Sequence, residues 1–222
     1  MPLMNSQINE IRKRYSVDEL KESANIMRGY DLICLAAAGS GHAGGTLSIM
    51  DITAALYLHV ARLDPEDPEW QGRDRIIWSV GHKAPSLYLG VGMAGYFDVK
   101  DVVTLRKLGS PFQGHPHWLK LPGVEASTGS LGQGLSIAVG MALGLRLEKS
   151  DARVFCIMGD GEQQEGQIWE AAMEAGHYKL DNIVAIIDKN RLQIDGWVKD
   201  VMNVDPLFEK YRSFGWEVFV VD

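Results

Sequence analysis

The sequence predicts an α/β fold, built on a mainly parallel sheet with helices on both faces. In its second half, three apolar segments (153–158, 183–187 and 217–221) alternate with two segments of helical periodicity (164–177 and 206–214). Strands that are apolar throughout are buried on both faces, and their alternation with helices is typical of a parallel sheet with right-handed crossovers. The 222 residues, 46% of them hydrophobic and 23% charged, are enough for one sizeable core.

The first half is predicted to be mainly helical. Ser16 and Glu19 have the spacing of a capping box, which predicts the start of a helix that Gly39 ends. A second helix is expected over residues 48–63, where an Asp-Pro pair stops it. A short buried strand is expected at residues 76–79.

The chain is expected to form a single domain over residues 1–222. A loop rich in glycine and proline is predicted at residues 109–123, but no repeat, low-complexity segment or linker divides the sequence. Because a parallel-sheet domain seldom ends directly after a strand, we expect this domain to be truncated at its C-terminus.

Composition and charge argue against several classes of protein. The formal net charge of −7 disfavours a nucleic-acid or anionic-membrane partner, since both require clustered Lys and Arg. No apolar stretch precedes Leu32, so no signal peptide is expected, and the sequence has no run of about 18 apolar residues. Cys34 and Cys156 lie in apolar segments, which favours buried core thiols over a disulfide. We therefore expect a cytoplasmic protein without nucleic-acid or membrane partners.

Polar residues follow two of the predicted strands. A Gly-Asp-Gly sequence at residues 159–161 follows the first strand, and Asp-Lys-Asn at residues 188–190 follows the next. Because the carboxyl ends of parallel strands share one edge of the sheet, the two turns are expected to lie side by side. Asp160 offers a carboxylate, Asn190 an amide oxygen, and Leu192 a backbone carbonyl. These hard oxygens predict a site for Mg²⁺, with Ca²⁺ or Mn²⁺ as alternatives.

This pair of motifs, separated by thirty residues, resembles the fingerprint of thiamine diphosphate enzymes. Either motif alone could be an ordinary turn, but further segments resemble transketolases in particular, and the resemblance runs from about Leu20 to Asp222. These segments are residues 40–45, 81–85, 113–116, 128–134, 159–166, 176–182 and 192–196. The resemblance implies the thiamine diphosphate-binding fold, as a diphosphate-binding domain, in an enzyme that moves a two-carbon ketol unit from a ketose to an aldose.

The resemblance also assigns roles to single residues. It implies that His42, His82 and His115 act on the sugar substrate. They lie in glycine-flanked loops, where a core residue is unexpected, and imidazole can exchange protons near neutral pH. It implies contact with thiamine diphosphate for His82, Gly129, Ser130, Leu131, Gly159, Asp160, Gly161, Glu165 and Asn190. His59 and His177 are interpreted as structural, and the role of His117 stays open.

In transketolases a second, pyrimidine-binding domain completes the active site. The resemblance therefore implies that the partner is a separate C-terminal transketolase subunit, with two copies of each chain in the assembly. The candidate contact is the helix at 164–177, with Glu165, Gly166, Trp169 and Glu170. The expected substrates are small sugars or sugar phosphates.

Other interpretations fit the sequence less well. Residues 39–44 match the dinucleotide pattern G-x-G-x-x-G, but a predicted helix precedes them where that motif requires a strand. A 1-deoxyxylulose-5-phosphate synthase-like enzyme and a non-catalytic relic of the family remain alternatives, and the Gly-His-Pro segment at residues 114–116 favours transketolase. Val80 and Lys83 stand where the family usually has Lys and Ala, and Ala43 where Pro or Ile is usual, so the resemblance does not fix the donor sugar.

Overall fold

A computed structural model describes residues 14–194 and 196–221 of the chain. The chain divides into two compact units. Unit 1 comprises the residues up to Asp74 together with Gly81–Gly129, and unit 2 comprises Arg75–Val80 and the residues from Ser130 onward. Each unit is described by itself.

Unit 1 begins with the predicted long helix, α2 (Val17–Ala38). The capping box is present, because the Ser16 amide donates to Glu19 Oε2 at 2.8 Å and the Glu19 amide donates to Ser16 Oγ at 3.4 Å. The helix ends at Gly39, whose φ of 67° is left-handed, a conformation that costs glycine no Cβ clash. Both predicted ends of this helix are confirmed.

The second predicted helix differs from the expected one. It begins earlier and consists of three pieces, α3 (Ala43–Ser48), α4 (Met50–Ala55) and the π-helical turn η1 (Leu56–Val60). The break falls at Ile49, where φ is −93° and ψ is 0°. Two threonine hydroxyls donate to the carbonyl four residues earlier, Thr46 to His42 and Thr53 to Ile49, a side-chain bond that competes with regular helix.

A buried helix, α5 (Ala84–Met93), lies at the centre of unit 1, and α2, α4 and η1 pack against it. Short 3₁₀ turns flank it, η2 (Gly81–Lys83) before and η3 (Val99–Thr104) after. A Cβ built on Gly90 would lie 2.7 Å from Thr53 Cγ2, so only glycine allows this close approach. The sequence pattern assigned no helix here.

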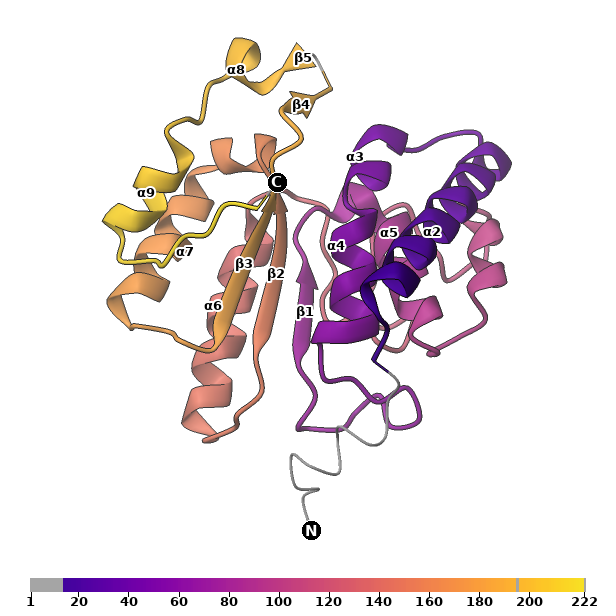
Figure 1. Cartoon of the computed structure of the whole chain (residues 1–222), viewed down its shortest axis with the longest axis horizontal. Coiled ribbons are helices and arrows are strands. Elements are labelled where there is room, and N and C mark those ends of the chain that lie inside the picture. The colour runs from indigo at the N-terminus through magenta and orange to yellow at the C-terminus, as the bar shows by residue number, and fades with distance from the viewer. Residues whose placement is uncertain (1–13, 195, 222) are drawn as a thin grey trace. The chain divides into compact units, whose positions relative to one another are not determined.

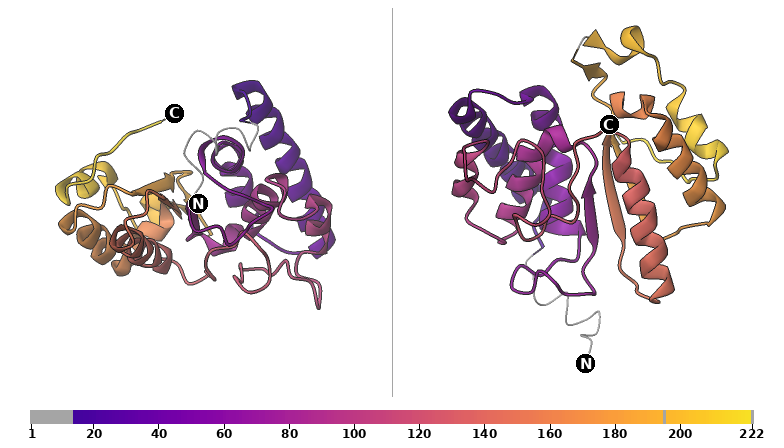
Figure 2. Two further views of the ribbon diagram at one scale, coloured as in Figure 1. Left: turned by 90° about the horizontal axis from the view of Figure 1, so that it is seen from below. Right: turned by 180° about the vertical axis from the view of Figure 1, so that it is seen from behind.

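Unit 2 contains a parallel three-stranded sheet in the order β1 (Arg75–Trp78), β2 (Val154–Gly159) and β3 (Ile183–Asp188), which Figure 1 shows side by side. Helix α6 (Gln133–Leu147) packs against all three strands, and α7 (Gly166–His177), preceded by the 3₁₀ turn η4 (Gly161–Gln164), packs against α6. Figure 2 shows α6 running alongside β2 from behind. The predicted α/β class and parallel sheet are confirmed.

The third predicted strand, at residues 217–221, is wrong. This segment forms no strand, and Phe219 and Val221 are 78% and 89% exposed. Its aromatic and β-branched residues favour extended backbone, but a strand also needs a hydrogen-bonded neighbour, and none pairs with it in the described part of the chain. Instead, the indole of Trp216 donates to the Ala172 carbonyl oxygen.

The chain after β3 forms small elements. The strands β4 (Leu192–Gln193) and β5 (Gly196–Trp197) pair as a hairpin, followed by α8 (Val198–Val201) and by α9 (Leu207–Ser213), which confirms the helix predicted at residues 206–214. In Figure 1 the hairpin lies beyond the carboxyl ends of β2 and β3.

The two cysteines lie in the core. Cys34 and Cys156 are both buried free thiols, as predicted. Among the described residues, no helix combines the length and the hydrophobicity that crossing a membrane requires.

Unit 1 also buries an unpaired carboxyl group. Asp31, on α2, is fully buried, and within the described chain neither of its oxygens has a hydrogen-bond partner. Loss of solvation raises the pKa of Asp31 to about 7, since burial penalises the charged form. Because the pKa of Asp31 is higher in the folded state, this group stabilises the fold fully at pH values below its pKa in the unfolded state, near 3.8. That contribution is lost as the pH rises through about 7.

We therefore expect Asp31→Asn to stabilise the protein at pH 8 and to have no such effect near pH 4. The asparagine avoids a buried charge, and the expected gain in free energy of unfolding at pH 8 is about 1–3 kcal/mol. Thermal melts from pH 4 to pH 8 measure it. The matched control is Asp74→Asn, which should destabilise at pH 8, because buried Asp74 accepts from the Arg62 amide at 2.9 Å. Parallel pH curves for wild type and Asp31→Asn would contradict the prediction.

Candidate functional site

The carboxyl edge of the sheet brings the two predicted turns together. Gly159 and Asp188, the last residues of β2 and β3, are paired in register, and the Asp160 amide donates to the Asp188 carbonyl oxygen at 3.3 Å. The side-by-side arrangement that the parallel strands predicted is therefore present in unit 2.

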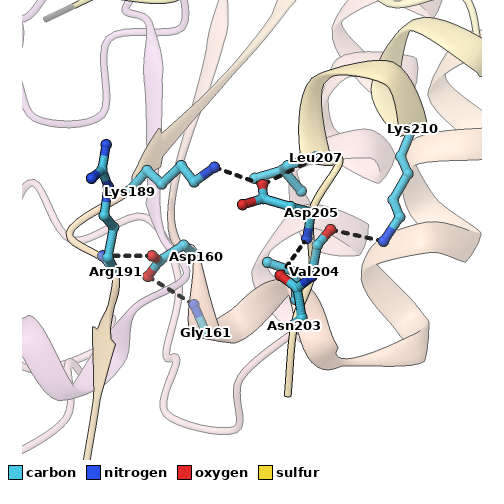
Figure 3. Close-up of polar contacts among 9 residues, drawn as sticks. All are labelled: Asp160, Gly161, Lys189, Arg191, Asn203, Val204, Asp205, Leu207 and Lys210. Atoms are coloured by element: carbon cyan, nitrogen blue, oxygen red, sulfur yellow. Dashed lines mark hydrogen bonds and ion pairs between the residues drawn. The ribbon is translucent and has the colours of Figure 1, made fainter. Parts of the chain in front are cut away.

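Asp160 links the two turns through its side chain. It is only 2% exposed. One carboxylate oxygen accepts from the Gly161 amide at 2.9 Å, and the other accepts from the Arg191 amide at 2.7 Å (Figure 3). Arg191 has a left-handed φ of 67°, so the backbone turns sharply where it meets the carboxylate. The carboxylate thus holds the turn after β3 against the turn after β2.

Asn190 and Leu192 follow in the same turn. The amide oxygen of Asn190 accepts from the Leu192 amide at 2.9 Å, and its nitrogen donates to Asp188 at 3.3 Å. The β4–β5 hairpin that starts at Leu192 is fixed to η4, because Gln164 donates to Gln193 at 2.8 Å. A Cβ on Gly161 would lie 2.8 Å from the same Gln193 oxygen, so the Gln193 side chain lies close against the backbone of this glycine.

The turn is also anchored toward α9. Lys189 donates to Asp205 at 2.6 Å, as Figure 3 shows, and its ammonium lies 5.1 Å from the centre of the Phe208 ring. The hydrogen bond from Lys189 is the largest cause that holds the pKa of Asp205 below its ordinary value. The residue before Asn190 is therefore held in place by the segment that leads into α9.

Glu162 is a buried carboxylate that the sequence prediction missed. It is 2% exposed, and it accepts hydrogen bonds from the Gly159 amide at 3.1 Å, from the Gly132 amide at 2.9 Å and from the Ser79 hydroxyl. These donors come from the ends of β2 and β1 and from the start of α6. One carboxylate therefore fixes three segments at this edge, and the only sequence signal was its place directly after Gly-Asp-Gly.

The remaining predicted cofactor residues of unit 2 lie at the start of α6 and of α7. Ser130 is exposed and Leu131 is half-buried, directly before Gly132, the left-handed N-cap of α6. Glu165 is the exposed N-cap residue of α7. A Cβ on Gly132 would lie 2.7 Å from Glu165 Cβ, so the two helix starts are in contact at this glycine.

The donor set at this edge fits a hard divalent cation. A carboxylate, an amide oxygen and backbone carbonyls are oxygen ligands that Mg²⁺ and Ca²⁺ prefer, and each carboxylate oxygen can accept more than one interaction. Among the described residues, no group of three or more His, Cys, Asp or Glu side chains could hold a metal. A cation here would therefore depend on Asn190 and on the backbone as well as on Asp160.

Unit 1 brings the three predicted substrate histidines together. His42 is the exposed N-cap residue of α3, and His82 lies in η2. Their ring centres are 5.4 Å apart in an edge-to-face arrangement. His115 is close enough to act electrostatically on both rings.

Two glycines make this close grouping possible. A Cβ on Gly81, the residue before His82, would lie 2.6 Å from the Gly129 amide nitrogen. A Cβ on Gly129, which has a φ of 156°, would lie 3.0 Å from Cγ of His115. Because neither position leaves room for a side chain, the loops of His82 and His115 approach each other closely at Gly129.

The grouping keeps two of the imidazoles uncharged at neutral pH. Burial is the largest cause that lowers the pKa of His82, to about 4, with the positive charge of Lys83 next. Burial and the charge of Arg106 lower the pKa of His42 as well. A neutral imidazole has one donor and one acceptor nitrogen, which suits hydrogen bonding to sugar hydroxyls.

Two of the residues that depart from the family pattern, Val80 and Lys83, are buried. Val80 is fully buried and Lys83 is 2% exposed. The stem of Lys83 lies against Gly45, where a Cβ would come within 2.8 Å of Lys83 Cε. Lys83 therefore acts on His82 from the interior of unit 1, through its charge.

The other histidines make local contacts. His59 Nδ1 lies 2.8 Å from the Tyr15 carbonyl oxygen, and the His177 ring packs edge-on against Tyr178. His117 Nδ1 accepts from the Leu119 amide at 3.2 Å, which places it in its own turn. The predicted site residues thus form two groups, one in each unit.

The helix predicted to contact a partner corresponds to α7, and only some of its candidate contact residues are exposed. Trp169 packs within unit 2, with its ring centre 5.5 Å from that of Tyr211 and with the Lys210 ammonium 5.3 Å away. Glu165, Gly166 and Glu170 are exposed. The three exposed residues stay candidates for such a contact, whereas much of Trp169 is already used inside the unit.

Comparison with known proteins identifies the family. Residues 20–222 match the family model described as transketolase, thiamine diphosphate binding domain. The 6-deoxy-6-sulfo-D-fructose transketolase subunit of Clostridium sp. (strain MSTE9) is 42% identical over 204 residues, which is 92% of this chain and 74% of the relative. An apulose-4-phosphate transketolase subunit of Phocaeicola vulgatus is 42% identical over 200 residues, 90% of this chain and 70% of the relative.

Solved structures of transketolases are also similar to this chain. The transketolase of Campylobacter jejuni is similar with a TM-score of 0.84 and 34% identity, over 90% of this chain. The transketolase of Leishmania mexicana is similar with a TM-score of 0.82 and 31% identity, over 91% of this chain. The chain spans about a third of these solved chains, 33% and 31%.

Proposed function

Because this chain belongs to the transketolase family, as its thiamine diphosphate-binding domain, we propose that it is the N-terminal subunit of a two-subunit transketolase. This enzyme moves a two-carbon ketol unit from a ketose to an aldose. One observation carries the proposal: relatives named as transketolase subunits align with 90% or more of this chain.

In this proposal, the sheet edge of unit 2 holds the cofactor's diphosphate through Mg²⁺. Asp160, the Asn190 side chain and the Leu192 carbonyl are the protein ligands, and Ca²⁺ or Mn²⁺ can replace Mg²⁺. Gly159 and Gly161 allow the backbone to approach the diphosphate, with Ser130, Leu131 and Glu165 beside it. The buried Asp160 and its hydrogen bonds to both turns support this assignment.

The histidines of unit 1 act on the sugar. Thiamine diphosphate, when bound, supplies the carbanion chemistry that breaks and forms the carbon–carbon bond. His42, His82 and His115 donate and accept hydrogen bonds to substrate hydroxyls, and they exchange protons with them. The lowered pKa values of His42 and His82 support this role, because a neutral ring can accept a proton.

The substrates that we propose are sugars with an anionic terminal group. The two relatives described above are named for a sulfo sugar and for a sugar phosphate. A donor ketose labelled with ¹³C at carbons 1 and 2, incubated with an acceptor aldose and the enzyme assembled with its second subunit, tests the reaction. Transfer of both labels to the acceptor supports the proposal, and failure to transfer them together from any phosphorylated or sulfonated ketose contradicts it.

The histidine roles give a direct prediction. His42→Ala, His82→Ala and His115→Ala should each lower kcat about 10²- to 10⁴-fold, the usual contribution of a positioned acid or base. Because these residues lie in loops, the free energy of unfolding should change by less than about 1 kcal/mol. Steady-state kinetics and thermal melts of the assembled enzyme measure both quantities.

The matched control is His59→Ala. His59 is exposed, and its ring contacts the Tyr15 carbonyl oxygen and not the histidine group. This variant should keep full turnover. A variant of the three that keeps full activity, or one that unfolds, argues against the role of that residue.

A further inference from the structure

Arg106 connects the two loops that carry His42 and His115. It follows η3, and its backbone is left-handed, with a φ of 60°, which is uncommon for a residue with a side chain. Its amide donates to the Phe112 carbonyl oxygen at 2.9 Å. This bond closes the loop of residues 106–112, which leads directly to His115.

The guanidinium reaches both histidine loops. Its Nη1 donates to Ser40 Oγ at 3.1 Å, two residues before His42. It also lies against the backbone of Gly114, the residue before His115. A Cβ on Gly114 would lie 3.0 Å from Arg106 Nε and 3.3 Å from its Cζ, so glycine leaves room for the guanidinium.

The charge of Arg106 is also placed toward the histidines. Among the described residues, the structure shows no ion pair for it, and the Ser40 hydroxyl is its one side-chain partner. The groups that face His42 are Arg106, His115 and the ring of His82, and Arg106 is the largest electrostatic cause of its lowered pKa. Lys83 acts on His82 from the interior.

We propose that Arg106 is a positioning residue, which holds the loops of His42 and His115 in one arrangement and keeps a permanent positive charge beside His42. This inference rests on the proposed function, because it assumes that the histidines act on substrate. It assigns no substrate contact to Arg106 itself. A guanidinium serves this purpose because its planar, permanently charged group has several donors in fixed directions.

The test compares Arg106→Gln with Lys107→Gln in the assembled enzyme. Lys107 is the exposed neighbour, and within the described residues its side chain makes no hydrogen bond or ion pair. Both variants lose one positive charge from the same loop. We expect Arg106→Gln to lower kcat at least about tenfold and to move the acid limb of the kcat/KM profile to higher pH, because the pKa of His42 rises when the neighbouring positive charge is removed. Lys107→Gln should leave kcat and the profile unchanged.

Two further variants separate geometry from charge. Arg106→Lys keeps the charge, so it should restore the wild-type pH profile but only part of kcat. In Gly114→Ala the added methyl group displaces the guanidinium but leaves its charge. This variant should lower kcat and shift the kcat/KM pH profile less than Arg106→Gln does. Wild-type kcat and pH profile in Arg106→Gln, while His42→Ala is inactive, would overturn the proposal and leave the proposed function standing. Full activity in His42→Ala would instead count against the proposed function.

Discussion

Replacing Asp160 by alanine is expected to abolish metal-dependent binding of thiamine diphosphate. In the proposed site this buried carboxylate is the one charged ligand, and it also holds the two turns together through the Gly161 and Arg191 amides. We expect the dissociation constant for the cofactor in the presence of Mg²⁺ to rise at least about 100-fold, since loss of a ligand costs more than loss of its supporting contacts. Isothermal titration of the assembled enzyme measures it.

Two comparisons make that result specific. Asp160→Asn keeps one acceptor oxygen, so it can retain one of the two amide hydrogen bonds while it loses the charge. It should therefore lower the melting temperature less than Asp160→Ala does and still lose affinity. Asp181→Ala removes an exposed carboxylate at the opposite end of β3 and should bind normally. Unchanged cofactor affinity in Asp160→Ala would remove Asp160 from the metal site.

The second large effect concerns the partner. We expect the isolated chain to have no measurable ketol transfer and to gain activity at least about 10³-fold when a C-terminal transketolase subunit is added. The resemblance to transketolases implies that a second, pyrimidine-binding domain completes the active site. Residues 20–222 all match the other domain, and the relatives named as subunits support a separate polypeptide.

Reconstitution from two purified chains measures this effect. Size-exclusion chromatography with light scattering gives the stoichiometry, and we propose two copies of each subunit. Charge reversal at exposed Glu170 on α7, by Glu170→Lys, tests the proposed contact surface, with exposed Glu148 after α6 as the matched control. Robust ketol transfer by the isolated chain would contradict the two-subunit proposal.

The sequence predicts the sheet edge well because two local signals coincide there. Continuous apolar strands indicate a parallel sheet, and the polar turns after β2 and β3 then must meet at one edge. The strand predicted at residues 217–221 failed because propensity alone does not provide a pairing neighbour. The sequence pattern also predicted neither α5 nor α6, and for α5 the reason is its burial. α5 is buried on almost every side, and a helix that is apolar all round shows no periodic stripe.

The residues that the sequence did not predict depend on tertiary contacts. Glu162 sits in a turn of polar residues, and only the fold shows that its carboxylate is buried among donors from β1, β2 and α6. In the sequence, Arg106 is an ordinary charged loop residue. Only the folded chain shows its contacts with Ser40 and Gly114. The family resemblance and the glycine-flanked loops singled out the three histidines, and the structure brings them together in unit 1.

The proposed cofactor site is tested most directly by titrating the assembled wild-type enzyme with thiamine diphosphate, in the presence of Mg²⁺ or of EDTA, and in parallel with NAD. We predict saturable binding of thiamine diphosphate, with one site for each copy of this chain. This binding should require the divalent cation, and NAD should not bind. Binding that is independent of the cation, or binding of NAD in place of thiamine diphosphate, would contradict this prediction.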